Sequence, residues 1–307
     1  MAGYTDRAFR LCVRELGGLG LAFTEMLNPG SLLRGGGRRK RTLLATSPED
    51  RPLGYQIYGK DPALLADAAR WVQDRGADLV DVNMGCPQKR IVGQGVGAAL
   101  LKTPGRAVEI VRQIRKAVTI PFTAKMRLGW DNAGTAAELA RAFEAEGVDA
   151  VTVHGRTRAQ GYGGRSDIEA IRGVAQSVAR IPVIANGDIV SVETARDVFA
   201  RTGCGGIMLG RHPIKEPWII RDIARDLLGR LPLAPPTRAE HLSFALRHLD
   251  RCVDLYGERI AVVQFRKWNP QYLKGLAVDR ATLVRLQRIA DLEALKAGLA
   301  EVFLGRK

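Results

Sequence analysis

The sequence of 307 residues predicts an α/β protein of the (β/α)8 TIM-barrel class, followed by a small C-terminal helical domain. Two observations predict this class. Short apolar stretches alternate with amphipathic stretches over residues 21–209, which is typical of βα units around a parallel sheet. After the stiff segment Leu233–Pro236, only helical periodicity remains. We therefore expect a catalytic barrel domain over residues 1–231 and a helical domain over residues 237–307.

The apolar stretches define the expected strands, which are Leu21–Met26, Leu53–Tyr58, Leu79–Met84, Phe122–Met126, Ala150–His154, Val183–Ala185 and Gly206–Leu209. The amphipathic stretches between them are expected to be helices, at Pro62–Arg75, Pro104–Ala117, Thr135–Glu146, Ser166–Ala179 and Val192–Thr202. The chain should begin with a loop and a helix capped by Thr5 or Asp6. The C-terminal helices are expected at Thr237–Tyr256, Glu258–Lys267 and Arg280–Phe303.

A closed (β/α)8 barrel needs an eighth strand, and the sequence supplies seven. The missing strand would be the first, because the chain begins where that strand should pass into its loop. A gap in the barrel would expose unpaired edges on the neighbouring strands, which proteins avoid. The sequence therefore predicts that its N-terminus is truncated or that its start is misassigned.

The composition argues against a membrane protein, a secreted disulfide-rich protein and a zinc protein. No run of about 18 apolar residues occurs, so we expect no membrane span. The first residues lack the apolar core of a signal peptide. The four cysteines show no paired spacing and the four histidines no metal-ligand spacing, which argues against disulfides and a zinc site and fits a reducing cytoplasm.

The formal net charge of +15 favours a polyanionic partner, with RNA or DNA as the first candidate. A basic proteome or an acidic lipid surface is the alternative. One cationic loop follows the first apolar stretch, where phosphate contact and a solvated charge run are both open: Arg34, Gly35, Gly36, Gly37, Arg38, Arg39, Lys40 and Arg41. The helical domain is also basic, which indicates a large charged substrate.

Cys86 lies just beyond the end of the stretch Leu79–Met84, after Asn83 and Gly85. A lone cysteine is most often a small core residue, but a position at a strand end favours chemistry. The thiol could act as a nucleophile or as a proton donor. Nearby cations would favour the thiolate and an apolar pocket the thiol, so both roles stay open.

Other polar residues also fall within or at the ends of expected strands. Gln56 interrupts an apolar stretch, so a buried side chain must find partners for both of its amide groups. Lys125 should face an anion or a cofactor, or form a Schiff base, and Arg127 should share its face. His154 ends the next stretch and is followed by two arginines, which favours a functional histidine over a core one.

The last two expected strands end in residues suited to phosphate. Asn186, Gly187 and Asp188 follow one strand, and Gly210 and Arg211 follow the other. Barrel proteins often bind phosphate in these loops through glycine amides and a helix N-terminus. We therefore expect a phosphate group at this edge.

With these residues in place, the chain resembles the tRNA-dihydrouridine synthase family over nearly its whole length. Eight stretches in the family's order carry the resemblance: MAGYTDRAFR at the start, TEM at 24–26, QIYG at 56–59, DVNMGCP at 81–87, KMRLGW at 125–130, VHGRTRAQGY at 153–162, PVIANGDI at 182–189 and IMLGR at 207–211. The basic helical tail accompanies them.

The resemblance implies an FMN-binding barrel, a C-terminal tRNA-binding domain and reduction of a uridine in tRNA to 5,6-dihydrouridine. NADPH reduces the flavin, the flavin gives hydride to carbon 6, and Cys86 protonates carbon 5. The residues implied to hold FMN are Met1, Gln56, Lys125, His154, Asn186, Gly187, Asp188, Gly210 and Arg211. Asn83 and Arg127 are implied to contact the uracil. The simplest expectation is a cytoplasmic monomer.

Two alternatives remain open. The first is a TIM-barrel lyase or aldolase that acts on a small phosphorylated substrate through a Schiff base on Lys125. The second is a tRNA-binding homologue whose catalysis is impaired by the missing first strand.

Overall fold

A computed structural model describes residues 1–34 and 36–305, apart from the side chains at positions 38 and 39. The chain divides into two compact units. The barrel unit contains residues 1–2, 20–40 and 51–210, and the helical unit contains residues 3–19, 41–50 and 211–307. Residue 35 of the predicted cationic loop lies outside the described part.

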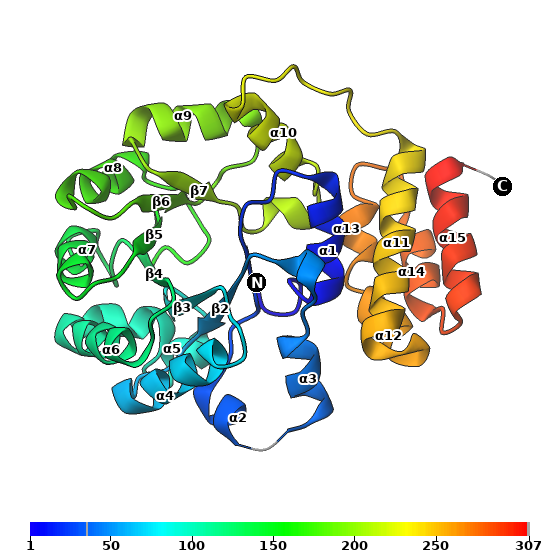
Figure 1. Cartoon of the computed structure of the whole chain (residues 1–307). Coiled ribbons are helices and arrows are strands. Elements are labelled where there is room, and N and C mark those ends of the chain that lie inside the picture. The colour runs from blue at the N-terminus through cyan, green and yellow to red at the C-terminus, as the bar shows by residue number, and fades with distance from the viewer. Residues whose placement is uncertain (35, 306–307) are drawn as a thin grey trace. The chain divides into compact units, whose positions relative to one another are not determined.

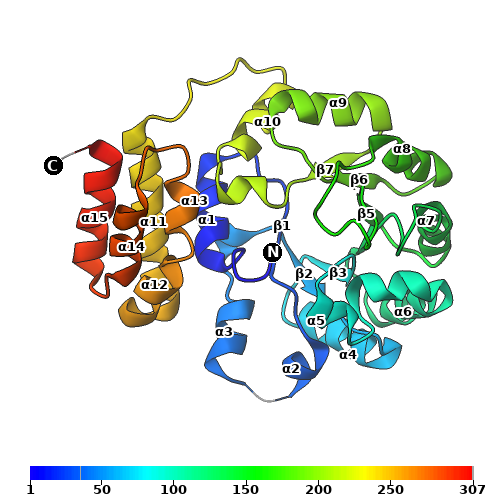
Figure 2. The same ribbon diagram turned by 180° about the vertical axis from the view of Figure 1, so that it is seen from behind.

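The barrel unit is built on a seven-stranded parallel sheet in which every strand pairs with its neighbour in the sequence. The strands are β1 Ala22–Phe23, β2 Leu53–Ile57, β3 Leu79–Met84, β4 Phe122–Arg127, β5 Ala150–His154, β6 Val183–Asn186 and β7 Gly206–Met208. Figures 1 and 2 show these strands in a curved row with the connecting helices outside it. The parallel α/β class and the seven predicted strands are confirmed, and the upstream strand stays a prediction.

The five predicted helices of the barrel unit are confirmed as α4 Pro62–Gln73, α6 Pro104–Ala117, α7 Ala136–Ala145, α8 Ile168–Ser177 and α9 Val192–Thr202. Three short elements were not predicted, namely α2 Pro29–Leu33, α5 Lys89–Val92 and the 3-10 turn η2 Gly97–Lys102. Asp61 caps α4 by accepting a hydrogen bond from the amide of Leu64, and Ser191 caps α9 within a capping box. Gly203 ends α9 in the left-handed conformation that favours glycine.

Two predicted segments of the barrel unit differ from the structure. The first expected strand is only Ala22–Phe23, because the chain beyond it pairs irregularly: the amide of Thr24 donates to Gly54 and that of Leu27 to Gln56. The expected cationic loop is also shorter, since helix α3 Arg38–Leu44 begins inside it and crosses the division between the units.

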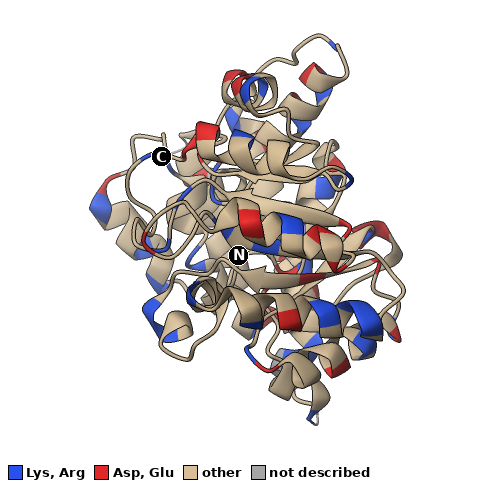
Figure 3. Cartoon of the chain, turned by 90° about the vertical axis from the view of Figure 1, so that its left-hand side faces the viewer, with Lys and Arg blue, Asp and Glu red and all other residues tan. Residues whose placement is uncertain are grey.

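Mixed charge covers the outer helices of the barrel unit. Figure 3 shows Lys and Arg interleaved with Asp and Glu on the face that it presents. Ion pairs explain part of this pattern, with Arg112 bound to Glu146 at 2.6 Å and Arg201 bound to Glu169 at 2.9 Å. Exposed pairs of this kind contribute little stability, but they prevent a patch of one sign.

The helical unit packs its elements around aromatic side chains. Its elements are α1 Arg7–Leu16, η1 Pro48–Asp50, η3 His212–Ile214, α10 Ile219–Leu227, α11 Arg238–Tyr256, α12 Glu258–Phe265, α13 Asn269–Tyr272, α14 Arg280–Arg288 and α15 Leu292–Leu304. Trp268 is 1% exposed and stacks on Phe9 and Tyr272. Asp6 caps α1 and also accepts a hydrogen bond from Tyr256 at 2.7 Å, so one of the two predicted caps is confirmed.

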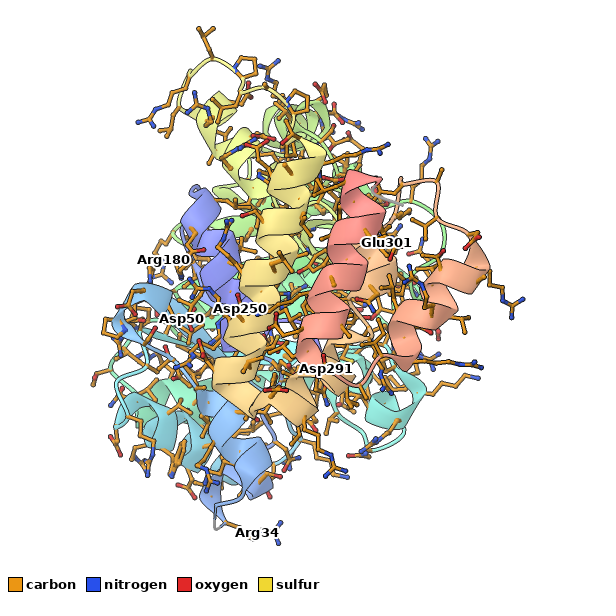
Figure 4. The ribbon with its side chains drawn as sticks, turned by 90° about the vertical axis from the view of Figure 1, so that its right-hand side faces the viewer. Arg34, Asp50, Arg180, Asp250, Asp291 and Glu301 are labelled. Carbon is orange, nitrogen blue, oxygen red and sulfur yellow. The ribbon has the colours of Figure 1, made fainter. Side chains whose placement is uncertain are left out.

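The predicted helix Arg280–Phe303 is wrong in one respect, because it consists of two helices. The apolar periodicity of this stretch continues without a break, but α14 ends at Arg288. The side chain of Asp291 then caps a new helix, α15, by accepting a hydrogen bond from the backbone amide of Ala294. Figure 4 shows Asp291 at the start of α15 and Asp250 on the neighbouring α11. Lys296 of α15 joins these helices through an ion pair of 3.0 Å with Asp250.

Two other features are absent from residues 1–34 and 36–305. None of the helices in this part combines the length and the apolar character that crossing a membrane requires. Nor do three or more His, Cys, Asp or Glu side chains of the same described residues gather where they could hold a metal ion.

Candidate active site

The strand register of the barrel unit brings the predicted side chains together. Asn83 on β3 is paired in register with Lys125 on β4. Arg127, two residues further on, is paired with His154 on β5, and His154 is paired with Asn186 on β6. Since the strands are parallel, these residues all lie toward the same end of the sheet.

Cys86 is held in a turn directly after β3. The side-chain oxygen of Asn83 accepts hydrogen bonds from the backbone amides of Gly85, at 3.1 Å, and Cys86, at 3.0 Å. The Cys86 carbonyl accepts the amide of Ala98 at 3.0 Å. Gly97 has φ of +62°, and a Cβ there would lie 2.9 Å from that carbonyl, so only glycine allows this close approach.

The thiol of Cys86 is half-buried and protonated near neutral pH. Burial raises its pKa above the ordinary value of 9.0, although a hydrogen bond with the backbone of Gln88 and the charges of Arg127 and Lys125 act in the opposite direction. The side chain is therefore suited to giving a proton, and a thiolate nucleophile is disfavoured.

Lys125 supplies a cation among these side chains. Its Nζ donates a hydrogen bond of 2.7 Å to Oδ1 of Asn186. Burial lowers the pKa of Lys125 to about 8, while the charge of Asp81 raises it. The amine is thus charged at neutral pH and loses its proton in mildly alkaline solution.

Gln56 finds partners for both amide groups, as the sequence required. Its Nε2 donates to Oδ2 of Asp81 at 2.7 Å, and its Oε1 accepts from Nδ2 of Asn83 at 2.9 Å. Asp81 is fully buried, and burial raises its pKa to about 6. Asp81 was not predicted from the sequence, although a carboxylate two residues before Asn83 in an apolar strand is a usable signal.

Arg127 is 1% exposed and binds backbone oxygens. Its Nε donates to Gly85 at 2.8 Å, and its Nη1 donates to Thr157 and Gly161, both at 2.8 Å. Arg127 therefore ties the turn that carries Cys86 to the loop after β5. The predicted contact between Arg127 and a uracil stays a prediction.

The segments that follow β5 and β6 pack closely around Gly187. Gly187 has φ of +121°, and a Cβ there would lie 2.5 Å from Oγ of Ser166 and 2.9 Å from the ring of His154. Asp188 also has a positive φ, of 52°. Its carboxylate accepts hydrogen bonds from Arg156 at 2.7 Å and from the amide of Ser166 at 2.8 Å.

The hydroxyl of Ser166 lies beside Gly187 and is not accounted for by these contacts. The buried Oγ of Ser166 has no hydrogen-bond partner among the described residues. Ser166 was not singled out from the sequence, and no motif marks it. The tight backbone of Gly187 and this hydroxyl form a cradle in which a side chain at position 187 would collide.

Gly210 and Arg211, the other two residues predicted to bind phosphate, belong to different units of the chain. Gly210 ends the barrel unit, and the nearest atom to a Cβ built on it is Sδ of Met1, at 4.0 Å. Arg211 follows directly but belongs to the helical unit, where it precedes η3. The predicted pairing of Gly210 and Arg211 around one phosphate therefore stays a prediction.

A parallel α/β sheet with a protonated thiol, a buried lysine and a glycine-lined cradle at its strand ends defines an enzyme of the TIM-barrel class. Its family follows from comparison: the model of the dihydrouridine synthase family matches residues 1–304, so the chain belongs to that family. The resemblance found in the sequence is confirmed. The protein is therefore an oxidoreductase that acts on a CH–CH bond, and the aldolase alternative loses its support.

Curated relatives match the chain over most of their lengths. The chain is 39% identical to tRNA-dihydrouridine synthase B of Pseudomonas aeruginosa, covering 100% of this chain and 92% of that protein. It is 37% identical to a probable tRNA-dihydrouridine synthase of Rhodobacter capsulatus, covering 98% and 93%. Among solved structures, a complex of 2-naphthoyl-CoA reductase has a TM-score of 0.55 at 13% identity, covering 73% of this chain and 47% of that one, which supports the fold alone.

Proposed function

We propose that this enzyme reduces a uridine in tRNA to 5,6-dihydrouridine, with FMN as the bound cofactor, NADPH as the reductant and Cys86 as the proton donor. The observation that carries the proposal is the half-buried thiol of Cys86, which burial keeps protonated next to the cations of Lys125 and Arg127. Reduction of a CH=CH bond needs one hydride and one proton, and this thiol suits the second need.

The residues at the strand ends fit FMN. The charged amine of Lys125 suits the electron-rich edge of a reduced flavin. The positive φ of Gly187 and the hydroxyl of Ser166, which finds no partner within residues 1–34 and 36–305, fit close approach of a phosphate. We propose that Asn186, Asp188, Gly210, Arg211 and His154 complete this cofactor site and that the backbone of Met1 contacts the ring system.

Bound FMN, once reduced by NADPH, would supply a hydride for carbon 6 of the uracil. Cys86 then gives the proton on Sγ to carbon 5, and solvent returns a proton to the thiolate. Asn83 and Arg127 are proposed to orient the uracil. Gln56 uses one donor and one acceptor within the protein, and each of its amide groups has capacity for one more bond, so it can also bind the flavin.

Support for tRNA comes from two basic pockets, one in each unit. The pocket of the barrel unit has a volume of about 500 Å³ and includes Lys60, Lys102 and Arg106. The pocket of the helical unit has a volume of about 450 Å³ and includes Arg266, Lys267 and Arg288. Such sites suit the phosphates of RNA, whose contacts dominate affinity.

An aromatic side chain strengthens the first of these pockets. Nζ of Lys102 and the guanidinium of Arg158 each lie 4.2 Å from the ring centre of Trp130. Unpaired RNA bases stack on aromatic rings and on the planes of arginine guanidinium groups. We propose residues 1–231 as the FMN-binding domain, residues 237–307 as the tRNA-binding domain, and a monomer working in the cytoplasm.

The test is direct turnover. The protein is incubated with FMN, NADPH and tRNA lacking dihydrouridine, and the modified base is measured by mass spectrometry. Cys86→Ala should lose most turnover and keep the flavin, whereas Cys204→Ala, at a buried thiol of the same unit, should keep both. Full activity of Cys86→Ala would refute the proton-donor role. Tight tRNA binding without turnover by the native sequence would favour an impaired homologue.

A further inference from the structure

A chain of hydrogen bonds runs from the buried Asp81 to the backbone of Cys86. Asp81 lies on β3 with 0% exposure. Its Oδ1 accepts from the hydroxyl of Thr123 at 2.7 Å, and its Oδ2 accepts from Nε2 of Gln56 at 2.7 Å. An ionised carboxylate offers acceptors only, so it requires Gln56 to present its nitrogen.

The next two links follow from the shape of an amide. Since Nε2 of Gln56 faces Asp81, its Oε1 faces Asn83 and accepts from Nδ2 at 2.9 Å. Asn83 in turn presents Oδ1 to the amides of Gly85 at 3.1 Å and Cys86 at 3.0 Å. Those amides only donate, so both ends of the chain require the same orientation of the two side-chain amides.

We propose that Asp81 is a positioning residue for Cys86: by holding the Gln56 amide it holds Asn83, and through Asn83 it fixes the turn that presents the thiol. This extends the proposed function, because the importance of the turn rests on the role of Cys86. Fully satisfied buried networks of this kind specify one geometry, while the loss of one member leaves a buried donor unpaired.

A simpler role for Asp81 is to balance the charge of Lys125. The two groups are near enough for the carboxylate to raise the pKa of Lys125. The hydrogen bond of Lys125, however, goes to Asn186, while those of Asp81 go to Thr123 and Gln56. The two roles differ in what they need: charge balance needs the negative charge, and positioning needs an acceptor oxygen aimed at Gln56.

Two substitutions separate these roles. Asp81→Asn removes the charge but can keep an oxygen toward Gln56 while its nitrogen donates to the hydroxyl of Thr123. Asp81→Leu removes both the charge and the acceptor. If Asp81 acts by positioning, the Asn variant should resemble the native protein and only the Leu variant should release the turn. If it acts by charge, both variants should behave alike.

The readout is the rate at which iodoacetamide alkylates Cys86 in cofactor-free protein. It is measured by mass spectrometry of the peptide that contains Cys86, at a fixed pH of about 8, below the ordinary thiol pKa. In the native turn, burial raises the pKa of the Cys86 thiol. Release of the turn would expose the thiol and remove this effect of burial, so that more of the reactive thiolate forms. Asp81→Leu should therefore react about five-fold faster or more, as expected from the loss of one hydrogen bond. Asp81→Asn should stay within about two-fold of the native rate, since it keeps that bond.

Two further variants test whether faster alkylation reflects loss of this hydrogen-bond chain or a general loss of stability in the barrel unit. Gln56→Leu breaks the same chain one link further on and should reproduce the fast alkylation, which keeps the test decisive where Asp81→Leu fails to fold. The matched control is Asp78→Leu, because Asp78 accepts the amide of Leu53 at the start of β2 and has no part in the chain. Its alkylation rate should equal that of the native protein.

Three outcomes would overturn the proposal: native rates in Asp81→Leu and Gln56→Leu, equal acceleration in Asp81→Asn and Asp81→Leu, or acceleration in Asp78→Leu. The alkylation assay needs neither flavin nor tRNA. A native protein without dihydrouridine synthesis would therefore refute the proposed function and leave the positioning role measurable.

Discussion

Nζ of Lys125 on β4 donates a hydrogen bond of 2.7 Å to Oδ1 of Asn186 on β6, with β5 lying between the two strands. The bond reaches past β5 and places a cation beside Asn186, a residue of the proposed cofactor site. The carboxamide oxygen carries no full charge, so this hydrogen bond compensates only in part for the burial that lowers the pKa of Lys125 to about 8.

FMN affinity should therefore fall as the pH rises through about 8, because Lys125 then loses the charge that attracts the anionic cofactor. Lys125→Met should bind FMN at least about ten-fold more weakly, equivalent to one charge-assisted hydrogen bond, and without this pH dependence. Fluorescence titration of FMN between pH 6.5 and 9.5, about 1.5 units either side of that pKa, measures both. An unchanged pH profile in Lys125→Met would contradict the assignment.

The same pKa has the opposite consequence for the cofactor-free protein. Its folded value of about 8 lies below the ordinary 10.5, so between these values the unfolded chain binds more protons. Stability should therefore rise with pH across that window through Lys125. Urea denaturation at several pH values should show this rise in the native protein and a flatter curve in Lys125→Met.

The sequence predicted the parallel strands because their apolar stretches are buried on both faces and recur at regular spacing. It also predicted that Gln56 needs two partners, which Asp81 and Asn83 supply. It missed the break before Asp291, because an apolar face continues through residues 280–303 and only a capping contact separates the helices. It also missed Ser166, whose significance arises from packing against Gly155 and Gly187.

Gly187→Ala should destabilise the protein by about 2 kcal/mol or more, since it combines a left-handed backbone with a collision against Ser166 and His154. The matched control is Gly173→Ala in the exposed middle of α8, where a Cβ meets no atom within 4 Å. That variant should be more stable by about 1 kcal/mol. Urea unfolding of both measures the difference, and equal stabilities would refute the tight packing at Gly187.

Arg127→Met should lower stability by about 3 kcal/mol, because the carbonyls of Gly85, Thr157 and Gly161 lose a charged donor that is itself buried. Arg172→Met, at an exposed arginine whose ion pair with Glu169 lies on one helix, should change stability by less than about 0.5 kcal/mol. The two variants are compared by denaturant unfolding. A native midpoint for Arg127→Met would show that its role is confined to substrate contact.

Affinity for tRNA should fall steeply with salt and should depend on the basic pocket of the barrel unit. Lys102→Ala and Arg106→Ala should each weaken binding and each lower the slope of log affinity against log salt by about one, if each side chain contacts one phosphate. Arg106 lies in the first turn of α6, and Lys116 lies in its last turn, about 15 Å away along the helix.

Lys116→Ala therefore removes the same charge from the same unit at a distance from the pocket. It should leave both the affinity and the salt slope close to the native values, because long-range attraction is screened beyond about 10 Å at 0.1 M salt. Filter binding of tRNA at four salt concentrations distinguishes the variants. Equal losses in Arg106→Ala and Lys116→Ala would mean that the net charge of +15 attracts tRNA without a defined contact at this pocket.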